Sequence, residues 1–180
     1  MGRFLPHVCA ALATQLLLVG CMTYPTSRTF YEPNVVGGRL RNATACGFVH
    51  TRDTVEIGIG NIVLAVMVGS PREPRLRHSD LNVTVTIEGP RSGWQFNPST
   101  LSIELNDPRQ TLYPTATVRT DGAGLVLWTI HYPEPAGLAD ELTIVVKPND
   151  LLVAGRPAEI PALHFKRVRK SDLFVASLNC

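Results

Sequence analysis

The sequence predicts an all-β fold, an antiparallel sandwich of about eight short strands. Apolar and polar residues alternate over several short stretches, most clearly from Leu81 to Glu88, as in strands with one buried and one solvated face. Turn signals built from glycine, proline, asparagine and aspartate recur at short intervals, and the chain contains 14 Gly and 14 Pro. No stretch has the spacing of an amphipathic helix. Together these observations favour sheets joined by tight turns.

The N-terminal stretch, residues 1–20, has the architecture of a secretory signal. Arg3 supplies the positive charge, and residues 8–19 form an apolar stretch interrupted only by Thr14 and Gln15. This stretch is too short to span a bilayer of about 30 Å as a helix. The sequence therefore predicts a leader that is removed from the mature protein.

The leader ends in Leu18-Val19-Gly20-Cys21, which resembles the lipobox of bacterial lipoproteins at every position. The resemblance implies cleavage before Cys21, a diacylglyceryl group on its thiol and acylation, for example by palmitate, of its new amine. Several acyl chains anchor a protein stably, whereas one chain binds a membrane only marginally. Met22 follows the cysteine where inner-membrane lipoproteins tend to have aspartate, which favours the outer membrane.

Two other interpretations of the leader stay open. An ordinary secreted protein could carry a cysteine at this position by chance. A leader from outside bacteria would turn Asn42-Ala43-Thr44 and Asn82-Val83-Thr84 into candidate glycosylation acceptors.

Residues 21–45 show little periodicity and contain Pro25, Pro33, Gly37 and Gly38. This composition favours an extended tether between the lipid and a folded domain. We therefore expect a signal peptide at 1–20, a lipidated tether at 21–45 and the sandwich domain at 46–180.

The first half of the domain begins with an apolar region at 54–68. Its first part alternates and its second part is continuously apolar, as in a strand buried on both faces, and Gly58-Ile59-Gly60 suggests a bulge or bend between them. The alternating stretch 81–88 is the clearest strand. Trp94 and Phe96 are expected to pack against the sheet edge, and residues 101–105 form a short strand that ends at Asn106-Asp107-Pro108.

The second half begins with a strand at 112–119, where Pro114 predicts an edge position or a bulge. Residues 120–124 form a turn in which Asp121-Gly122 provides the positive φ of a tight hairpin. We therefore expect a hairpin from Ala116 to Ile130. Further strands are expected at 142–146 and from 163 through 170, with a short apolar stop at 151–153 and a last strand or closing turn before Cys180.

The Thr120-Asp121-Gly122 turn in a β-rich exported domain resembles bacterial immunoglobulin-like repeats over about thirty residues. The resemblance implies an immunoglobulin-like sandwich and transfers no activity, because one fold supports many functions.

Four cysteines are present, of which Cys9 leaves with the leader and Cys21 is the lipidation site. Cys46 and Cys180 remain in an exported chain, where a pair is more often bridged than free. We expect a disulfide between them, and two free thiols are the alternative.

Two groups of basic residues lie on the predicted surface, although the formal net charge of +2 is too small to indicate nucleic acid binding. The group on the expected strand after Leu163 is typical of an edge strand guarded against aggregation. The alternative is contact with anionic lipid or with an acidic partner. The groups consist of Arg72, Arg75 and Arg77 in the loop 70–80, and of Lys166, Arg167, Arg169 and Lys170.

No cofactor and no catalytic motif are predicted, and the nucleophile elbow Gly-x-Ser-x-Gly is absent. A metal site assembled from His50, His131 and His164 across strands is one alternative, which would make the chain a metal-binding protein or a lipid-anchored enzyme. A carbohydrate or peptidoglycan binder that stacks sugars on Trp94 and Trp128 is another. The leading hypothesis is a non-enzymatic outer-membrane lipoprotein that faces the periplasm. It is expected to serve as a structural or assembly component that binds another envelope protein.

Overall fold

The computed structural model describes residues 21–42, 49, 51–69, 81–106, 108–133, 135 and 139–177. Fourteen strands and one short 3-10 helix, η1 (Pro98–Thr100), account for the regular structure of these residues, which contain no α-helix. The described residues divide into two compact units. The larger unit comprises 29–42 and the described part of 52–169, and the smaller unit comprises 21–28, 49, 51 and 170–177.

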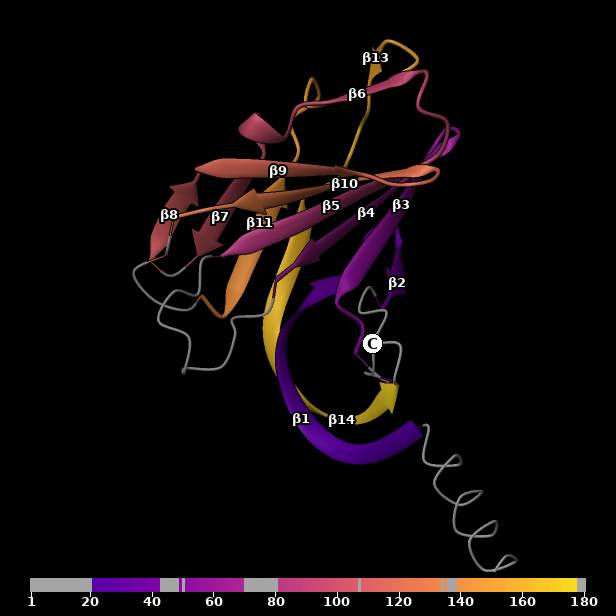
Figure 1. Ribbon diagram of the computed structural model, residues 1–180. Helices are drawn as coiled ribbons and strands as arrows, with labels where there is room; N and C mark the ends of the chain where they lie inside the picture. Colours follow the sequence, from indigo (N-terminus) through magenta and orange to yellow (C-terminus); the bar gives the residue numbers. More distant parts are fainter. Residues whose placement is uncertain are drawn as a thin grey trace, which may run out of the picture. The chain divides into compact units, whose positions relative to one another are not determined.

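A six-stranded antiparallel sheet forms one layer of the larger unit (Figure 1). Two neighbouring strands of this sheet, Asn82–Glu88 and Leu125–His131, have strictly alternating burial, because every second side chain faces the core. This confirms the strand predicted at 81–88. The order is β2 (Arg39–Arg41), β3 (Thr54–Ile59), β4 (Ile62–Val68), β5 (Asn82–Glu88), β10 (Leu125–His131) and β9 (Ala116–Asp121).

A five-stranded sheet forms the other layer, and the described residues also form a small three-stranded sheet. The five-stranded order is β1 (Cys21–Asn34), β14 (Leu163–Ser177), β11 (Glu141–Val145), β7 (Ser102–Asn106) and β8 (Arg109–Leu112). The three-stranded order is β13 (Arg156–Pro157), β12 (Leu151–Val153) and β6 (Trp94–Phe96).

One hydrophobic core joins the two large sheets, which confirms the all-β sandwich. Leu64, Ile87 and Ile130 from the six-stranded sheet belong to the same buried cluster as Ile103 and Ile144 from the five-stranded sheet. Burial of each such side chain stabilises the fold by about 1.5–3 kcal/mol. The immunoglobulin-like class within the sandwich architecture remains a prediction.

Among the sequence-based predictions, the extended tether at residues 21–45 differs most from what the structure shows. Residues 21–34 form β1 and residues 39–41 form β2, and the side chains of Phe30 and Tyr31 are buried in the larger unit. The Tyr31 hydroxyl donates a hydrogen bond of 2.9 Å to the carbonyl of Ala139. Pro25 and Pro33 are compatible with a strand because β1 lies at the edge of its sheet, which is where sheets accommodate proline. The tether prediction is therefore wrong for these residues, and the fold begins well before residue 46.

Two further differences concern turns. The strand predicted at 112–119 is broken around Pro114, where the chain leaves β8 in one sheet and enters β9 in the other; both lie at sheet edges, as Pro114 predicted. The predicted hairpin from Ala116 to Ile130 is confirmed as β9 and β10, but its positive φ of 78° belongs to Gly124 and not to Gly122. The chain also has more strands than the eight or so expected, because short strands such as β2, β12 and β13 carry too few residues to show a period.

Candidate functional site

Several of the residues singled out in the sequence lie outside the described residues. These are the leader 1–20, Cys46, Cys180, and Arg72, Arg75 and Arg77 in the loop between β4 and β5. Cys21 is the first residue of β1, and its side chain is not described. Lipidation of Cys21 and the disulfide therefore stay predictions.

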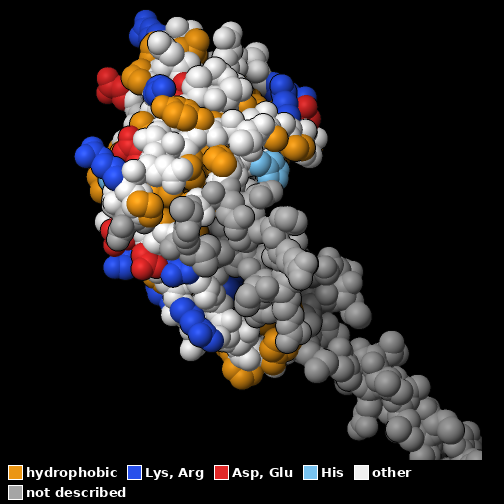
Figure 2. All heavy atoms as spheres, turned by 90° about the vertical axis from the view of Figure 1, so that its left-hand side faces the viewer, with side chains coloured by type: hydrophobic (Ala, Val, Ile, Leu, Met, Phe, Trp, Pro, Cys, Tyr) orange, Lys and Arg blue, Asp and Glu red, His pale blue; other side chains and the backbone are white. Residues whose placement is uncertain are grey.

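The basic residues of β14 do not lie on an edge strand. β14 lies between β1 and β11 in the sheet, and its pairing with β11 reaches Lys166, after which the Arg167 N–H donates to the Asp140 carbonyl. The hypothesis of an edge guard is therefore wrong for Lys166 and Arg167. Arg167 forms an ion pair of 2.7 Å with Asp140, and Lys166 forms one of 3.4 Å with Glu141. On the face seen in Figure 2, acidic and basic side chains likewise lie close to one another. Local carboxylates thus balance part of the charge that the sequence shows as a basic run.

The histidines that are described do not converge. His131 lies on β10 of the six-stranded sheet, whereas His164 lies on β14 of the five-stranded sheet, with its Nδ1 2.9 Å from the Thr143 hydroxyl. Within the described part of the chain, no three His, Cys, Asp or Glu residues are grouped so that they could hold a metal ion. His50 and His78 lie outside the described residues.

The two tryptophans pack against each other. Trp128 is only 5% exposed, and Trp94 and Phe96 each form an edge-to-face contact with it, with ring centroids 5.7 and 5.0 Å away. The guanidinium of Arg119 lies 5.6 Å from the Trp128 centroid, a cation–π arrangement. Trp94 and Phe96 thus pack against the six-stranded sheet, as predicted, and they contact it at Trp128 of β10, the strand next to the edge strand β9. Trp128 is too deeply buried to stack on a sugar, which leaves Trp94 alone for that hypothesis.

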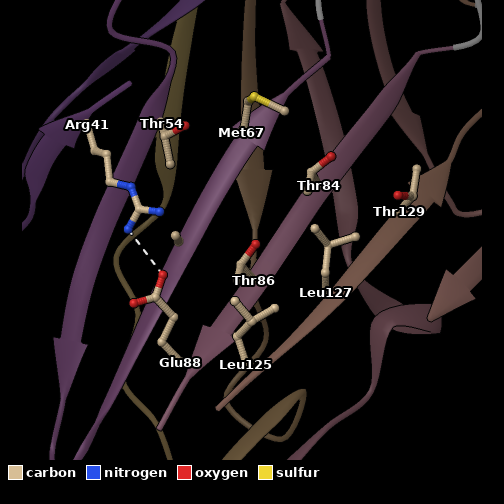
Figure 3. Close-up of a pocket in the computed structure, with 10 residues that line it drawn as sticks. Arg41, Thr54, Met67, Thr84, Thr86, Glu88, Leu125, Leu127 and Thr129 are labelled. Carbon is tan, nitrogen blue, oxygen red and sulfur yellow. Dashed lines mark hydrogen bonds and ion pairs between the residues drawn. The ribbon is translucent and has the colours of Figure 1, made fainter. Parts of the chain in front are cut away.

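The candidate site is a groove of about 370 Å³ on the face of the six-stranded sheet that points away from the core (Figure 3). The strand register sets neighbouring side chains in three rows across β3, β4, β5 and β10. The rows consist of Thr54, Met67, Thr84 and Thr129, then Ala65, Thr86 and Leu127, then Glu88 and Leu125.

The surface of this groove is mainly apolar. Met67, Leu125 and Leu127 are partly exposed, although side chains on the outer face of an antiparallel sheet are usually polar. The threonines present both a methyl group and a hydroxyl group. The first row continues onto the edge strand, where Val118 lies opposite Thr129 and is 53% exposed. Such a surface can bury apolar side chains and form hydrogen bonds, as protein interfaces do.

An ion-pair cluster closes one end of the groove. Arg41 bonds both Glu56 and Glu88, the latter at 3.1 Å, and Arg39 also bonds Glu56. The dashed line in Figure 3 marks the Arg41–Glu88 pair. The Glu56 side chain is 2% exposed, while those of Arg39 and Arg41 are 78% and 45% exposed. The arginines therefore cover a carboxylate that the sheet buries.

These contacts shift the pKa values of Glu56 and Arg41. Burial by itself raises the pKa of Glu56, but the hydrogen bonds from Arg39 and Arg41 outweigh it and hold this pKa below its ordinary value. The bonds to Glu56 and Glu88 raise the pKa of Arg41. Glu56 and Arg41 are therefore both charged near neutral pH.

The sequence alone identified only part of this site. The solvated face of 81–88 was predicted, but the apolar residues that continue the surface on neighbouring strands were missed. The available signal was Leu125 and Leu127, which are apolar at the positions between the core residues Val126, Trp128 and Ile130.

Comparison with known proteins gives no assignment: no protein-family model, no curated protein and no solved structure matches the chain. Among the described residues, no helix has the length and apolar character needed to cross a membrane.

Proposed function

We propose that the chain is a non-enzymatic lipoprotein of the bacterial outer membrane, anchored through Cys21 and facing the periplasm. We further propose that it binds an envelope protein through the groove face of the six-stranded sheet. The lipobox-like residues Leu18-Val19-Gly20-Cys21 support the anchor. The observation that carries the binding role is the apolar surface formed by Met67, Leu125 and Leu127 on the outer side of a sheet whose core is already complete on the other side.

A protein partner fits this surface better than a small molecule or a sugar does. The groove is open and its rows extend onto β9, all six residues of which are exposed at the edge of the sheet. Unpaired backbone groups on an edge strand can hydrogen-bond an added strand. The partner's apolar side chains would lie over the rows, and its charged groups would meet Arg41 and Glu88 at the closed end.

Two measurements on the full chain test the two parts of this proposal. Mass spectrometry of the mature N-terminus is expected to show an acylated Cys21, and Cys21→Ser is expected to abolish membrane association. An unmodified N-terminus at another residue would contradict the anchor.

For the partner, a photo-crosslinking amino acid at Leu127 is expected to yield one discrete protein adduct in intact envelopes. The same group at Val36, which is 65% exposed in the loop after β1, is the matched control and is expected to yield none. Adding Leu125→Asp is expected to remove the Leu127 adduct. An adduct with glycan fragments, or no adduct at all, would overturn the binding role.

A further inference from the structure

The six-stranded sheet ends at β9, which pairs with β10 on one side only. Among the described residues, no strand pairs with its other side (Figure 1). All six residues of β9 are exposed, both those on the groove face and those on the opposite face. β9 therefore projects beyond the other layer of the sandwich, and its edge is open to an added strand.

The hydrogen bonds of the β9–β10 hairpin show which backbone groups point to this open edge. In an antiparallel pair, every second residue bonds the neighbouring strand, and the residues in between direct their N–H and C=O groups to the other side. The Gly122 N–H donates to the Leu125 carbonyl and continues the register of the hairpin. Counting back from Gly122, the residues that direct their backbone groups outward are Thr117, Arg119 and Asp121. An added antiparallel strand would pair with these three.

Two charged side chains lie at the same edge. Arg119 and Asp121 are on the face opposite the groove, in register with the core residues Trp128 and Val126, and they form an ion pair of 2.9 Å within the chain. Their side chains are 56% and 44% exposed, so another molecule can reach both. Charged residues commonly guard an edge strand against pairing. β9 carries one charge of each sign, however, so a strand in a suitable register would place opposite charges together.

These charges discriminate among the registers in which a second copy of β9 could pair with the first. Two identical strands pair about a two-fold axis that passes through one residue of the strand. An axis at Arg119 or at Asp121 would set that residue directly opposite its own copy, which is destabilising because like charges repel. An axis nearer the start of the strand, for instance at Val118, would set both charges opposite uncharged residues. An axis at Thr120 sets Arg119 of each copy opposite Asp121 of the other and the two threonines opposite each other, and both kinds of pair stabilise a sheet.

The axis at Thr120 also joins the grooves of the two copies. Thr120 lies opposite Leu127, so it continues the second row of the groove, in which Thr86 and Leu127 are neighbours (Figure 3). Since Thr120 would meet its own copy on that face, the row would run from one groove into the other. The two grooves would then lie on the same face of one continuous sheet.

We propose that the open edge of β9 binds a second copy of this chain, paired antiparallel about a two-fold axis at Thr120. Arg119 of each copy exchanges backbone hydrogen bonds with Asp121 of the other, and their side chains form ion pairs across the axis. The dimer is weak in solution, because a single strand edge buries less area than a standard interface. It goes beyond the proposed function, whose envelope partner would lie over the joined rows, and it does not depend on that partner.

The first test is self-association of the mature chain with Cys21→Ser, in which no acyl chain contributes. Sedimentation equilibrium is expected to show monomers and dimers in exchange. Arg119→Asp and Asp121→Arg are each expected to weaken self-association about tenfold, because each sets like charges opposite each other. An equimolar mixture of these two variants is expected to restore the dimer, because the acidic strand of one then faces the basic strand of the other. Arg109→Asp on β8, the edge strand of the five-stranded sheet, is the matched control and is expected to leave association unchanged.

The second test is a cysteine placed at the axis. Residues directly opposite each other in a non-hydrogen-bonded antiparallel pair have Cα atoms about 4.5 Å apart, a separation that a disulfide can span. Thr120→Cys is therefore expected to give a covalent dimer under mild oxidation. Ala116→Cys, on the same face of the same strand, is the matched control and is expected to give none, because it would lie opposite the hairpin turn of the other copy. The chain without an added cysteine measures any crosslinking through Cys46 and Cys180.

The outcomes separate this dimer from the proposed function. A chain that stays monomeric at millimolar concentration, a monomeric mixture of the two charge variants, or equal crosslinking at Thr120 and Ala116 would overturn the dimer. Loss of association in Arg109→Asp would move the contact to β8 and would also overturn it. A monomeric chain that still gives the Leu127 adduct in envelopes would keep the proposed binding role, whereas a dimer without that adduct would overturn the binding role alone. An unchanged melting temperature and circular dichroism spectrum shows that a variant is folded.

Discussion

At the scale of single residues, Glu56 links the stability of the sandwich to its candidate site. Its carboxylate is buried on the outer face of the six-stranded sheet and is covered by Arg39 and Arg41. A buried carboxylate without partners is costly, whereas an exposed arginine without a partner is solvated. The contribution of this cluster to stability therefore depends mainly on whether the Glu56 carboxylate keeps its hydrogen bonds.

We predict that combining Arg39→Ala with Arg41→Ala lowers the free energy of unfolding by about 2 kcal/mol. The cost stays moderate because removing two long side chains also lets water reach the carboxylate. Adding Glu56→Gln is expected to recover part of the loss, since the buried charge disappears. Arg91→Ala, at an exposed ion pair with Asp121, is the control and is expected to change stability by less than about 0.5 kcal/mol. Urea unfolding measures all of these, and equal losses in the double variant and in the control would contradict the prediction.

Removing the two arginines is predicted to reverse the sign of the pH dependence that Glu56 contributes to the free energy of unfolding. In the native chain the pKa of Glu56 is lowered, so its contribution to stability is present above the unfolded pKa and is lost as pH falls through the folded pKa. Without the two arginines, burial alone would raise this pKa, and acidification would then stabilise the variant relative to neutral pH. Urea midpoints are measured across the acid range for the native chain and for the variant without the two arginines. The contribution of Glu56 is expected to give the two curves opposite slopes against pH. Parallel curves would contradict the proposed role of the arginines.

At the scale of elements, the β3–β4 hairpin requires a left-handed backbone conformation at one residue. Gly60 has a φ of 58°, and Ile59 pairs with Ile62 on either side of the turn. The sequence predicted a bulge or bend near Gly58-Ile59-Gly60, and the structure has a two-residue turn there. This tight turn makes β3 and β4 neighbours, so that Thr54 and Met67 meet in the first row of the groove.

We predict that Gly60→Ala destabilises the protein by about 1–2 kcal/mol, because a side chain disfavours the left-handed conformation. Space is not the reason, since the nearest atom to a new Cβ would be Val153 Cγ1 at 3.8 Å. Gly58→Ala is the matched control, because its φ is not positive and nothing lies within 4 Å of a new Cβ. The control is expected to be neutral or stabilising by about 0.5 kcal/mol. The melting temperatures of the two variants are compared. A Gly60→Ala variant as stable as Gly58→Ala would show that the positive φ of Gly60 does not limit the stability of the protein.

At the scale of the whole molecule, the expected disulfide would join distant parts of the chain. Val49 and Thr51, soon after Cys46 in the sequence, bond Leu173 and Asp172 of β14, which lead toward Cys180. These contacts support the proposed pair, although both cysteines lie outside the described residues.

We predict that the oxidised mature chain, unfolded without reductant, has no free thiol once Cys21 is acylated. A crosslink over such a long loop contributes roughly 4–5 kcal/mol in the denatured-state entropy model. Cys46→Ser and Cys180→Ser are each expected to lower the melting temperature equally, and the double variant is expected to lose no more. Two reactive thiols in the unfolded chain would show that the bridge does not exist.

Local sequence patterns were enough to predict the class of fold and most of the strands. Alternation within one strand, as at Leu81–Glu88, reports which side chains face the core, and Asp-Gly or Asn-Pro steps report where a strand ends. These are local properties, because they depend only on neighbouring residues. The lipobox-like residues are equally local, and this is why an anchor was predicted without any knowledge of the sheets.

Which strands are neighbours could be read only from the folded chain. β1 joins its sheet although its prolines suggested a tether, and β14 is an interior strand although its charges suggested an edge. The groove exists only because β3, β4, β5 and β10 set Met67, Thr86 and Leu127 side by side. Strand order and register depend on contacts between residues far apart in the chain, whose free energy comes from burial in a common core rather than from any local pattern.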